Sequence, residues 1–209
     1  MTTKRIALVI TLLLLLAAGA AAATYYFVKY TREKDESNIE LEEAKRLLED
    51  ARSMGDWSRA RNILATVQTH ASKAAATWEG NAIDAWIVEG EALLRMTKFR
   101  EAGVMLEKAL TRRPDDAHII GLAAEASFHL YMISRRAADF DAAFSLMERA
   151  VGSNPARDLL LKAAILCNTR GQFERADQYI SQLESSAPDS VEAAEARGLK
   201  AARAAEESK

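Results

Sequence analysis

Few side chains in this sequence have both the type and the spacing that chemistry requires. His118 and His129 would lie three turns apart on one helix, too far to share a metal ion, and His70 is distant in the chain. The single cysteine, Cys167, has no partner for a disulfide or a paired-cysteine metal site, and it reads as a buried small apolar residue. Zinc-helix, phosphate-loop and nucleophile-turn motifs do not occur. We therefore expect no enzyme activity, no metal and no cofactor.

Asp115 and Asp116 are the one pair of adjacent carboxylates placed where a role is easy to assign. They follow Pro114 and precede an apolar segment that is expected to be helical. A carboxylate at the start of a helix accepts hydrogen bonds from free backbone N–H groups. The sequence therefore predicts a helix cap here, in preference to a metal site.

The elements that hold these residues are set by a repeating pattern around the prolines. Pro114, Pro155 and Pro188 each have a phenylalanine fifteen residues earlier and an alanine twelve residues earlier. Spacings of three and four place the matched residues on one helical face, and a proline marks the end of each helix. The pattern predicts pairs of helices, the second of each pair closed by proline. The matched residues are Phe99, Phe140 and Phe173, with Ala102, Ala143 and Ala176.

The segment 83–116 resembles the tetratricopeptide repeat (TPR), a helix-turn-helix unit of about 34 residues. Trp86, Gly90, Ala102 and Pro114 stand at the positions that carry the resemblance. Similar units follow at 117–157, with seven extra residues, and at 157–190; a degenerate unit without proline precedes them at 41–74. The resemblance implies an all-α, right-handed solenoid over residues 41–190, closed by a capping helix at 191–209.

The N-terminus has the layout of an export signal. A short basic start is followed by an apolar run from Ile6 to Leu16, broken only by Thr11, and by small residues up to Ala23. One possibility is a signal cleaved after Ala23. We favour the other, a signal anchor (1–28) in which the uncharged residues 6–28 form a transmembrane helix.

This N-terminus also leads to a predicted location. Residues 29–40 would form a polar stem between the membrane and the repeats. Basic residues are more numerous after the predicted span than before it, which alone would place the domain in the cytoplasm. Because a long domain can follow an export signal largely regardless of its charge, we predict a single-pass protein of the bacterial inner membrane with a periplasmic C-terminal domain.

The remaining candidate function is binding to another protein. The formal net charge of -2 gives no reason to expect a nucleic acid as partner. The resemblance implies that the first helices of successive units line a concave groove that holds partners. The matched inward positions are Lys45, Glu49 and Arg52; Ile87, Glu91, Leu94 and Arg95; Phe128, Met132, Arg135 and Arg136; and Leu161, Ile165 and Asn168.

These positions also suggest the kind of partner. Glu49 stands four residues after Lys45, where family members that clamp a terminal carboxylate have asparagine, so we do not expect that clamp. An apolar floor with Phe128 pointing out of the stack, and an edge formed by Arg95, Arg135 and Arg136, would suit an amphipathic or acidic protein segment.

We therefore predict a membrane-anchored adaptor or scaffold. The alternative is a structural homo-oligomer whose groove is filled by its own capping helix or by a second copy. Light scattering of the part from Thr31 onward separates the two, because only self-assembly gives a concentration-dependent dimer.

Overall fold

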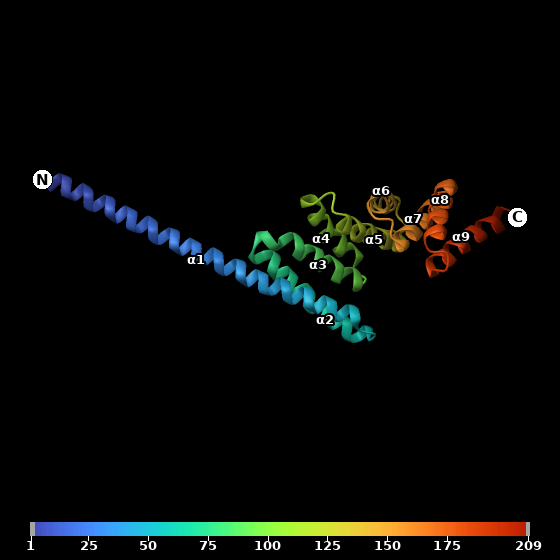
Figure 1. Ribbon diagram of the computed structural model, residues 1–209, viewed down its shortest axis with the longest axis horizontal. Helices are drawn as coiled ribbons and strands as arrows, with labels where there is room; N and C mark the ends of the chain where they lie inside the picture. Colours follow the sequence, from blue (N-terminus) through green and yellow to red (C-terminus); the bar gives the residue numbers. More distant parts are fainter. Residues whose placement is uncertain (1–2, 208–209) are drawn as a thin grey trace.

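The computed structural model describes residues 3–207, and within them the side chains of residues 15–205. Over this part the chain is helical apart from its turns (Figure 1). The α-helices are α1 (Thr3–Ser53), α2 (Trp57–Thr77), α3 (Ala82–Arg95), α4 (Phe99–Arg112), α5 (Ala117–Ser134), α6 (Ala137–Ser153), α7 (Arg157–Thr169), α8 (Phe173–Ser186) and α9 (Val191–Glu207), with a short 3₁₀ turn, η1 (Glu79–Asn81), before α3.

The helices stack in sequential order as pairs. Each helix packs against the next along the chain, and the first helices of the pairs also contact one another, α1 with α3, α3 with α5 and α5 with α7. Among the described residues, the backbones of the second helices α2, α4, α6 and α8 do not approach one another in this way. The first helices therefore form one layer and the second helices another, which is a helical solenoid and confirms the all-α solenoid part of the predicted fold class.

The small residues of the repeat lie where helices approach most closely. Ala102 and Ala143 are fully buried and Ala176 is 1% exposed. A Cβ atom added at Gly90 of α3 would lie 2.8 Å from Cγ of Leu106 in α4, so only glycine fits this crossing without a shift. The matched alanines and Gly90 thus set the distance between helices.

The second helices end just before the prolines, as the pattern predicts. Helices α4, α6 and α8 stop at Arg112, Ser153 and Ser186, each two residues before its proline. Asp116 caps the following helix α5, because its Oδ1 accepts hydrogen bonds from the backbone N–H groups of His118 and Ile119 at 3.0 and 3.3 Å. The predicted cap is confirmed.

Helix α5 joins two hydrophobic cores. Ile119, Ala123 and Ala126 lie in the core formed with α1 to α4, whereas Ala124 and Phe128 lie in the core formed with α6 to α9. A helix that is apolar on both sides is buried between its neighbours. Helix α9 closes the second core with Ala193 and Ala196, so it ends the stack as the predicted cap.

Ala143→Leu is expected to lower the free energy of unfolding by about 1 to 3 kcal/mol, because the added side chain has no space between the helices. Ser145→Leu adds the same side chain to the exposed face of the same helix and should change stability by less than about 0.5 kcal/mol. Urea unfolding followed by circular dichroism measures both. Equal tolerance of the two substitutions would mean that the repeat register is wrong.

Helix α1 is longer than its partner α2 and extends away from the stack towards the N-terminus (Figure 1). It is continuous through the predicted polar stem and packs against α2 through residues such as Leu41, Ala44 and Leu48. Nearer the N-terminus its one aromatic contact outside the helix is between Tyr30 and Trp78, whose ring centroids lie 4.4 Å apart. The chain between positions 15 and 39 is otherwise mostly exposed.

The prediction of a single-pass protein of the bacterial inner membrane with a periplasmic domain is wrong. In the described part of the chain, no helix combines the length and the apolarity that crossing a membrane requires. The side chains of residues 6–14 of the predicted span lie outside the described ones.

Candidate functional site: a groove between the first helices

A groove of about 370 Å³ opens on the layer of first helices, between α1, α3 and α5. We call it the first-helix groove. Charged and aromatic side chains form its walls, and leucines lie between them. Its lining residues are Arg52, Glu91, Leu94, Arg95, Phe99, His118, Leu122, Glu125 and His129.

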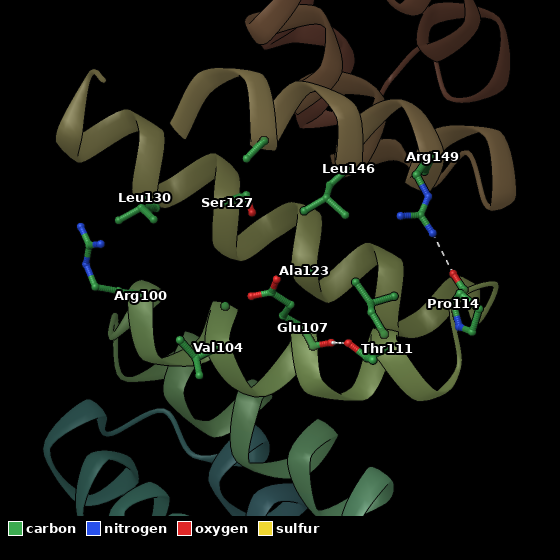
Figure 2. Close-up of a pocket in the computed structure, with 13 residues that line it drawn as sticks. Arg100, Val104, Glu107, Thr111, Pro114, Ala123, Ser127, Leu130, Leu146 and Arg149 are labelled. Atoms are coloured by element: carbon green, nitrogen blue, oxygen red, sulfur yellow. Dashed lines mark hydrogen bonds between the residues drawn. The ribbon is translucent and has the colours of Figure 1, made fainter. Parts of the chain in front are cut away.

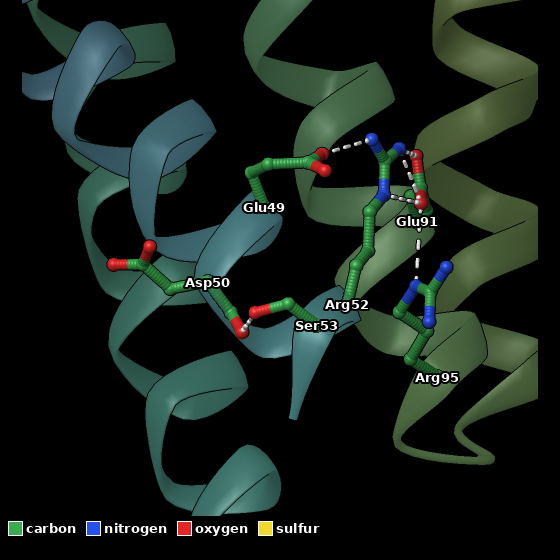
Figure 3. A network of polar contacts seen from close by, with 6 residues as sticks. All are labelled: Glu49, Asp50, Arg52, Ser53, Glu91 and Arg95. Atoms are coloured by element: carbon green, nitrogen blue, oxygen red, sulfur yellow. Dashed lines mark hydrogen bonds and ion pairs between the residues drawn. The ribbon is translucent and has the colours of Figure 1, made fainter. Parts of the chain in front are cut away.

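One wall is a network of ion pairs around Glu91 (Figure 3). Arg52 donates hydrogen bonds to both carboxylate oxygens of Glu91, at 2.6 and 2.5 Å from Nη2, and Arg95 donates from Nε at 3.3 Å. Glu91 is only 8% exposed, so its charge is compensated by two guanidinium groups. Arg52 also bonds Glu49 at 2.8 Å, and the Glu91 bond raises the pKa of the Arg52 guanidinium. The network joins the end of α1 to α3.

The opposite wall is built by α5 with support from α7. The ring of His129 stacks on Phe99 with centroids 4.7 Å apart. Nε2 of His129 lies 3.7 Å from Oε1 of Glu125, and Nζ of Lys162 donates a hydrogen bond to the same oxygen at 3.0 Å. The contacts with His129 and Lys162 lower the pKa of Glu125 to about 2 although its partial burial acts in the opposite direction. Glu125 therefore stays ionised in the groove at neutral pH.

Several solved structures have the same arrangement of helices. A crystal structure of MamA superposes with a TM-score of 0.57 at 19% identity, covering 70% of this chain and 82% of MamA. YrrB, described as a TPR protein with an unusual peptide-binding site, gives 0.53 at 17% identity over 68% of this chain and 73% of its own. TTC0263, a thermophilic TPR protein of Thermus thermophilus, gives a TM-score of 0.50 at 16% identity over 68% of this chain and 73% of its own.

This chain has the TPR fold. The resemblance seen in the Phe, Ala and Pro pattern is thereby confirmed at the level of fold. No protein-family model matches the sequence. No curated protein matches it either. The TPR relationship is thus visible in the structure and in the repeat positions rather than in overall sequence similarity.

The first-helix groove of this TPR stack contains some of the residues expected at inward positions. Leu94 and Arg95 of α3 line it, together with Arg52 and Glu91, which are also among the matched inward positions. The other predicted partner-binding residues lie elsewhere. Three of them, Ile87, Met132 and Ile165, are partly buried against the two cores, and Phe128 and Leu161 are buried within the second core. Asn168 is half-buried in α7. Arg135 and Arg136 are exposed in the turn after α5. Whether any of them binds a partner stays a prediction.

The expectation that Phe128 points out of the TPR stack is wrong. Its side chain is 6% exposed and belongs to the second core. The face of α5 that lines the groove is the stripe of His118, Leu122, Glu125 and His129. Glu125 lies two helical turns before the predicted Met132 and so shares its face, whereas Phe128 is next to His129 and about 100° away around the helix.

The sequence contains a signal for the missed groove residues. His118, Leu122, Glu125 and His129 have the spacing of a single helical stripe, and this stripe is the polar one on a largely apolar helix. A polar stripe on a buried helix indicates a face that borders solvent or a ligand. Phe99 was identified as a repeat position, but its contact with His129 requires two units to be placed side by side.

Within the described residues, no group of three or more His, Cys, Asp and Glu side chains is arranged to hold a metal ion. Cys167 is buried in α7, and its burial raises the pKa of the thiol. A thiol with a raised pKa is a poor nucleophile at neutral pH. The groove itself presents ion pairs, aromatic rings and apolar side chains.

Acid should weaken the fold through Glu125. Because its folded-state pKa is lowered from the usual 4.5 to about 2, ionised Glu125 stabilises the folded state above pH 4.5, and this contribution is lost as the pH falls from 4.5 towards 2. Glu125→Gln should therefore melt at a lower temperature than wild type at pH 6, and the difference should shrink by pH 2. Glu195→Gln, an exposed position in α9, is the control and should follow wild type throughout. A Glu125→Gln difference that does not change with pH would contradict the ion-pair assignment.

Proposed function

We propose that this protein is an interaction scaffold that binds a segment of another protein in the first-helix groove. The observation that carries the proposal is the groove itself, an open space of about 370 Å³ between three first helices. Leu94, Leu122 and Phe99 supply apolar contact, and contacts with Glu91 and Glu125 hold Arg95 and His129 in place beside them. YrrB, which has the same fold, is described as having a peptide-binding site.

The groove suits an amphipathic segment. Glu91 is compensated by two arginines, and Glu125 by His129 and Lys162, so neither carboxylate requires a cation from the ligand. Apolar ligand side chains would pack on Leu122 and on the Phe99–His129 stack. Arg135 and Arg136, at the end of α5, have no carboxylate partner in the described part of the chain, so acidic residues of the ligand would pair with them.

The competing occupant is the protein itself. Helix α9 packs against α7 and α8 and contributes no residue to the groove within the described chain. Self-occupation would therefore need a second copy. We also propose that the array is divided into units at 41–74, 83–116, 117–157 and 157–190, which gives each unit one first helix that can border the binding surface.

The test is a peptide selected by the full-length protein from a random library. Leu122→Arg should weaken its binding by about 2 kcal/mol, because apolar contacts at the centre of an interface carry most of the affinity. Val191→Arg introduces the same side chain on α9, at a position that is 72% exposed and outside the groove, and should bind as wild type does. Fluorescence anisotropy measures the affinities. Equal affinity of the two variants would reject this groove as the binding site.

A further inference from the structure

A second groove lies on the other side of the stack, between α4 and α6 and above α5 (Figure 2). We call it the α4/α6 groove. Its volume is about 540 Å³, within the range of ligand-binding pockets. Val104, Leu130 and Leu146 form its apolar surface, and Val104 is 47% exposed. Helices α4 and α6 both pack on α5, and the groove lies between them.

The corresponding space between α6 and α8 is filled. There Phe144 of α6 and Tyr179 of α8 leave no cavity that could hold a water molecule. The guanidinium of Arg175 lies over the ring of Phe144, 5.5 Å from its centroid, and also pairs with Glu148. An aromatic ring and a cation from neighbouring units thus close this space together.

The repeat register shows which side chains the α4/α6 groove lacks. Phe144 stands four residues after the matched Phe140, and the residue four after Phe99 is Gly103. Arg175 stands two residues after Phe173, and the residue two after Phe140 is Ala142. Both Gly103 and Ala142 line the groove. The aromatic ring and the cation of the filled space are therefore replaced here by a hydrogen atom and a methyl group.

One side chain of the filled space between α6 and α8 has a counterpart in the α4/α6 groove. Glu107 is eight residues after Phe99, as Glu148 is eight after Phe140. Glu148 pairs with Arg175, whereas the Glu107 side chain has no cationic partner in the described part of the protein. Figure 2 shows Glu107 inside the groove, between Arg100 and Arg149 at its ends. Arg149 is held there by a hydrogen bond of 2.7 Å to the carbonyl oxygen of Pro114.

We propose that the α4/α6 groove binds a segment of another protein that presents an aromatic side chain beside an arginine or lysine. The ring fills the space at Gly103 and packs on Val104 and Leu146, and the cation pairs with Glu107. The ligand thus supplies in trans the two groups that Phe144 and Arg175 supply within the chain. This surface is separate from the first-helix groove and can be occupied at the same time.

The experiment uses the full-length chain and a labelled twelve-residue helical peptide with one phenylalanine and one arginine four residues apart. A second peptide has glutamate in place of the arginine, and a third has alanine in place of the phenylalanine. We expect the first peptide to bind at least about tenfold more tightly than either of the others, measured by fluorescence anisotropy. Equal affinities for the three peptides would overturn the proposal.

Variants of the protein locate the site. An atom added at Cβ of Gly103 meets nothing within 4 Å, so Gly103→Phe can fill the groove without a clash and should reduce affinity at least about tenfold. Gly152→Phe makes the same change at another open helical glycine that is outside the groove, and should bind as wild type does. Glu107→Arg should reverse the preference between the arginine and glutamate peptides. Unchanged binding by a folded Gly103→Phe protein would overturn the assignment.

Two further measurements separate the possible outcomes. Leu122→Arg, which tests the first-helix groove, should not change binding of these peptides, so either proposal can fail without the other. Sedimentation of wild type and Gly103→Phe over a range of concentrations detects self-association. A dimer of wild type that is lost in Gly103→Phe would show that a second copy fills the groove, and would overturn the proposal of a foreign segment.

Discussion

Phe128→Ala is expected to lower the free energy of unfolding by about 3 to 5 kcal/mol, the usual cost of removing a buried aromatic ring. The side chain is 6% exposed and lies in the second core, edge-on to His129 with centroids 5.5 Å apart. Truncation leaves a cavity where α5 meets the C-terminal half of the stack. Urea unfolding monitored by circular dichroism gives the change in free energy, and the helical content in the absence of urea shows whether the variant still folds.

Ile133→Ala is the matched control for this loss. It lies on the same helix but is 71% exposed, so its truncation should change stability by less than about 0.5 kcal/mol. Should Phe128→Ala unfold like Ile133→Ala, the burial of Phe128 would be incorrect and Phe128 would belong to an outer surface.

Leu106→Ala is expected to cost about 2 to 5 kcal/mol, because Leu106 is fully buried where α4 crosses α3. The opposing residue is Gly90, which has no side chain to fill the cavity. Gly90→Ala alone gains helix propensity of about 1 kcal/mol but brings its Cβ to within 2.8 Å of Leu106 Cγ, so part or all of that gain is lost to overpacking. Denaturant unfolding of both single variants measures these effects.

The double variant Gly90→Ala/Leu106→Ala then tests the contact directly. The methyl group introduced at position 90 enters the space left by Leu106, so the double variant should be more stable than the sum of the single changes by about 0.5 kcal/mol or more. Additive changes would mean that these residues do not meet, and that the pairing of α3 with α4 is out of register.

Much of the fold could be predicted from the spacing of a few residue types. Ala143 and Ala176 are buried because two helices can approach closely only over small side chains, and this requirement places small residues at regular intervals in the sequence. The prolines after α4, α6 and α8 mark helix ends because proline cannot continue a helix. Helix α2 likewise continues to Thr77, because the alanine-rich segment 71–77 contains neither proline nor glycine.

The candidate sites depend on relations between units, which the sequence shows only in part. On α3 the predicted inward positions Leu94 and Arg95 line the first-helix groove, whereas on α5 the predicted Phe128 is buried next to the lining residue His129. The contact of Phe99 with His129 and the open space above Gly103 both require adjacent units to be positioned in space. The predicted membrane span failed for a different reason, because it rested on composition at the N-terminus and on none of these contacts.

Site-specific photo-crosslinking in the native cell tests most directly whether the first-helix groove holds another protein. A photoreactive phenylalanine analogue replaces Leu122 in the groove, or the exposed Val191 of α9, in the full-length chain. Mass spectrometry then identifies the residues attached at each position. We predict that one foreign protein segment is attached at position 122 and not at position 191. Attachment only to copies of this chain at position 122, or equal attachment of the same proteins at both positions, would contradict the proposed function.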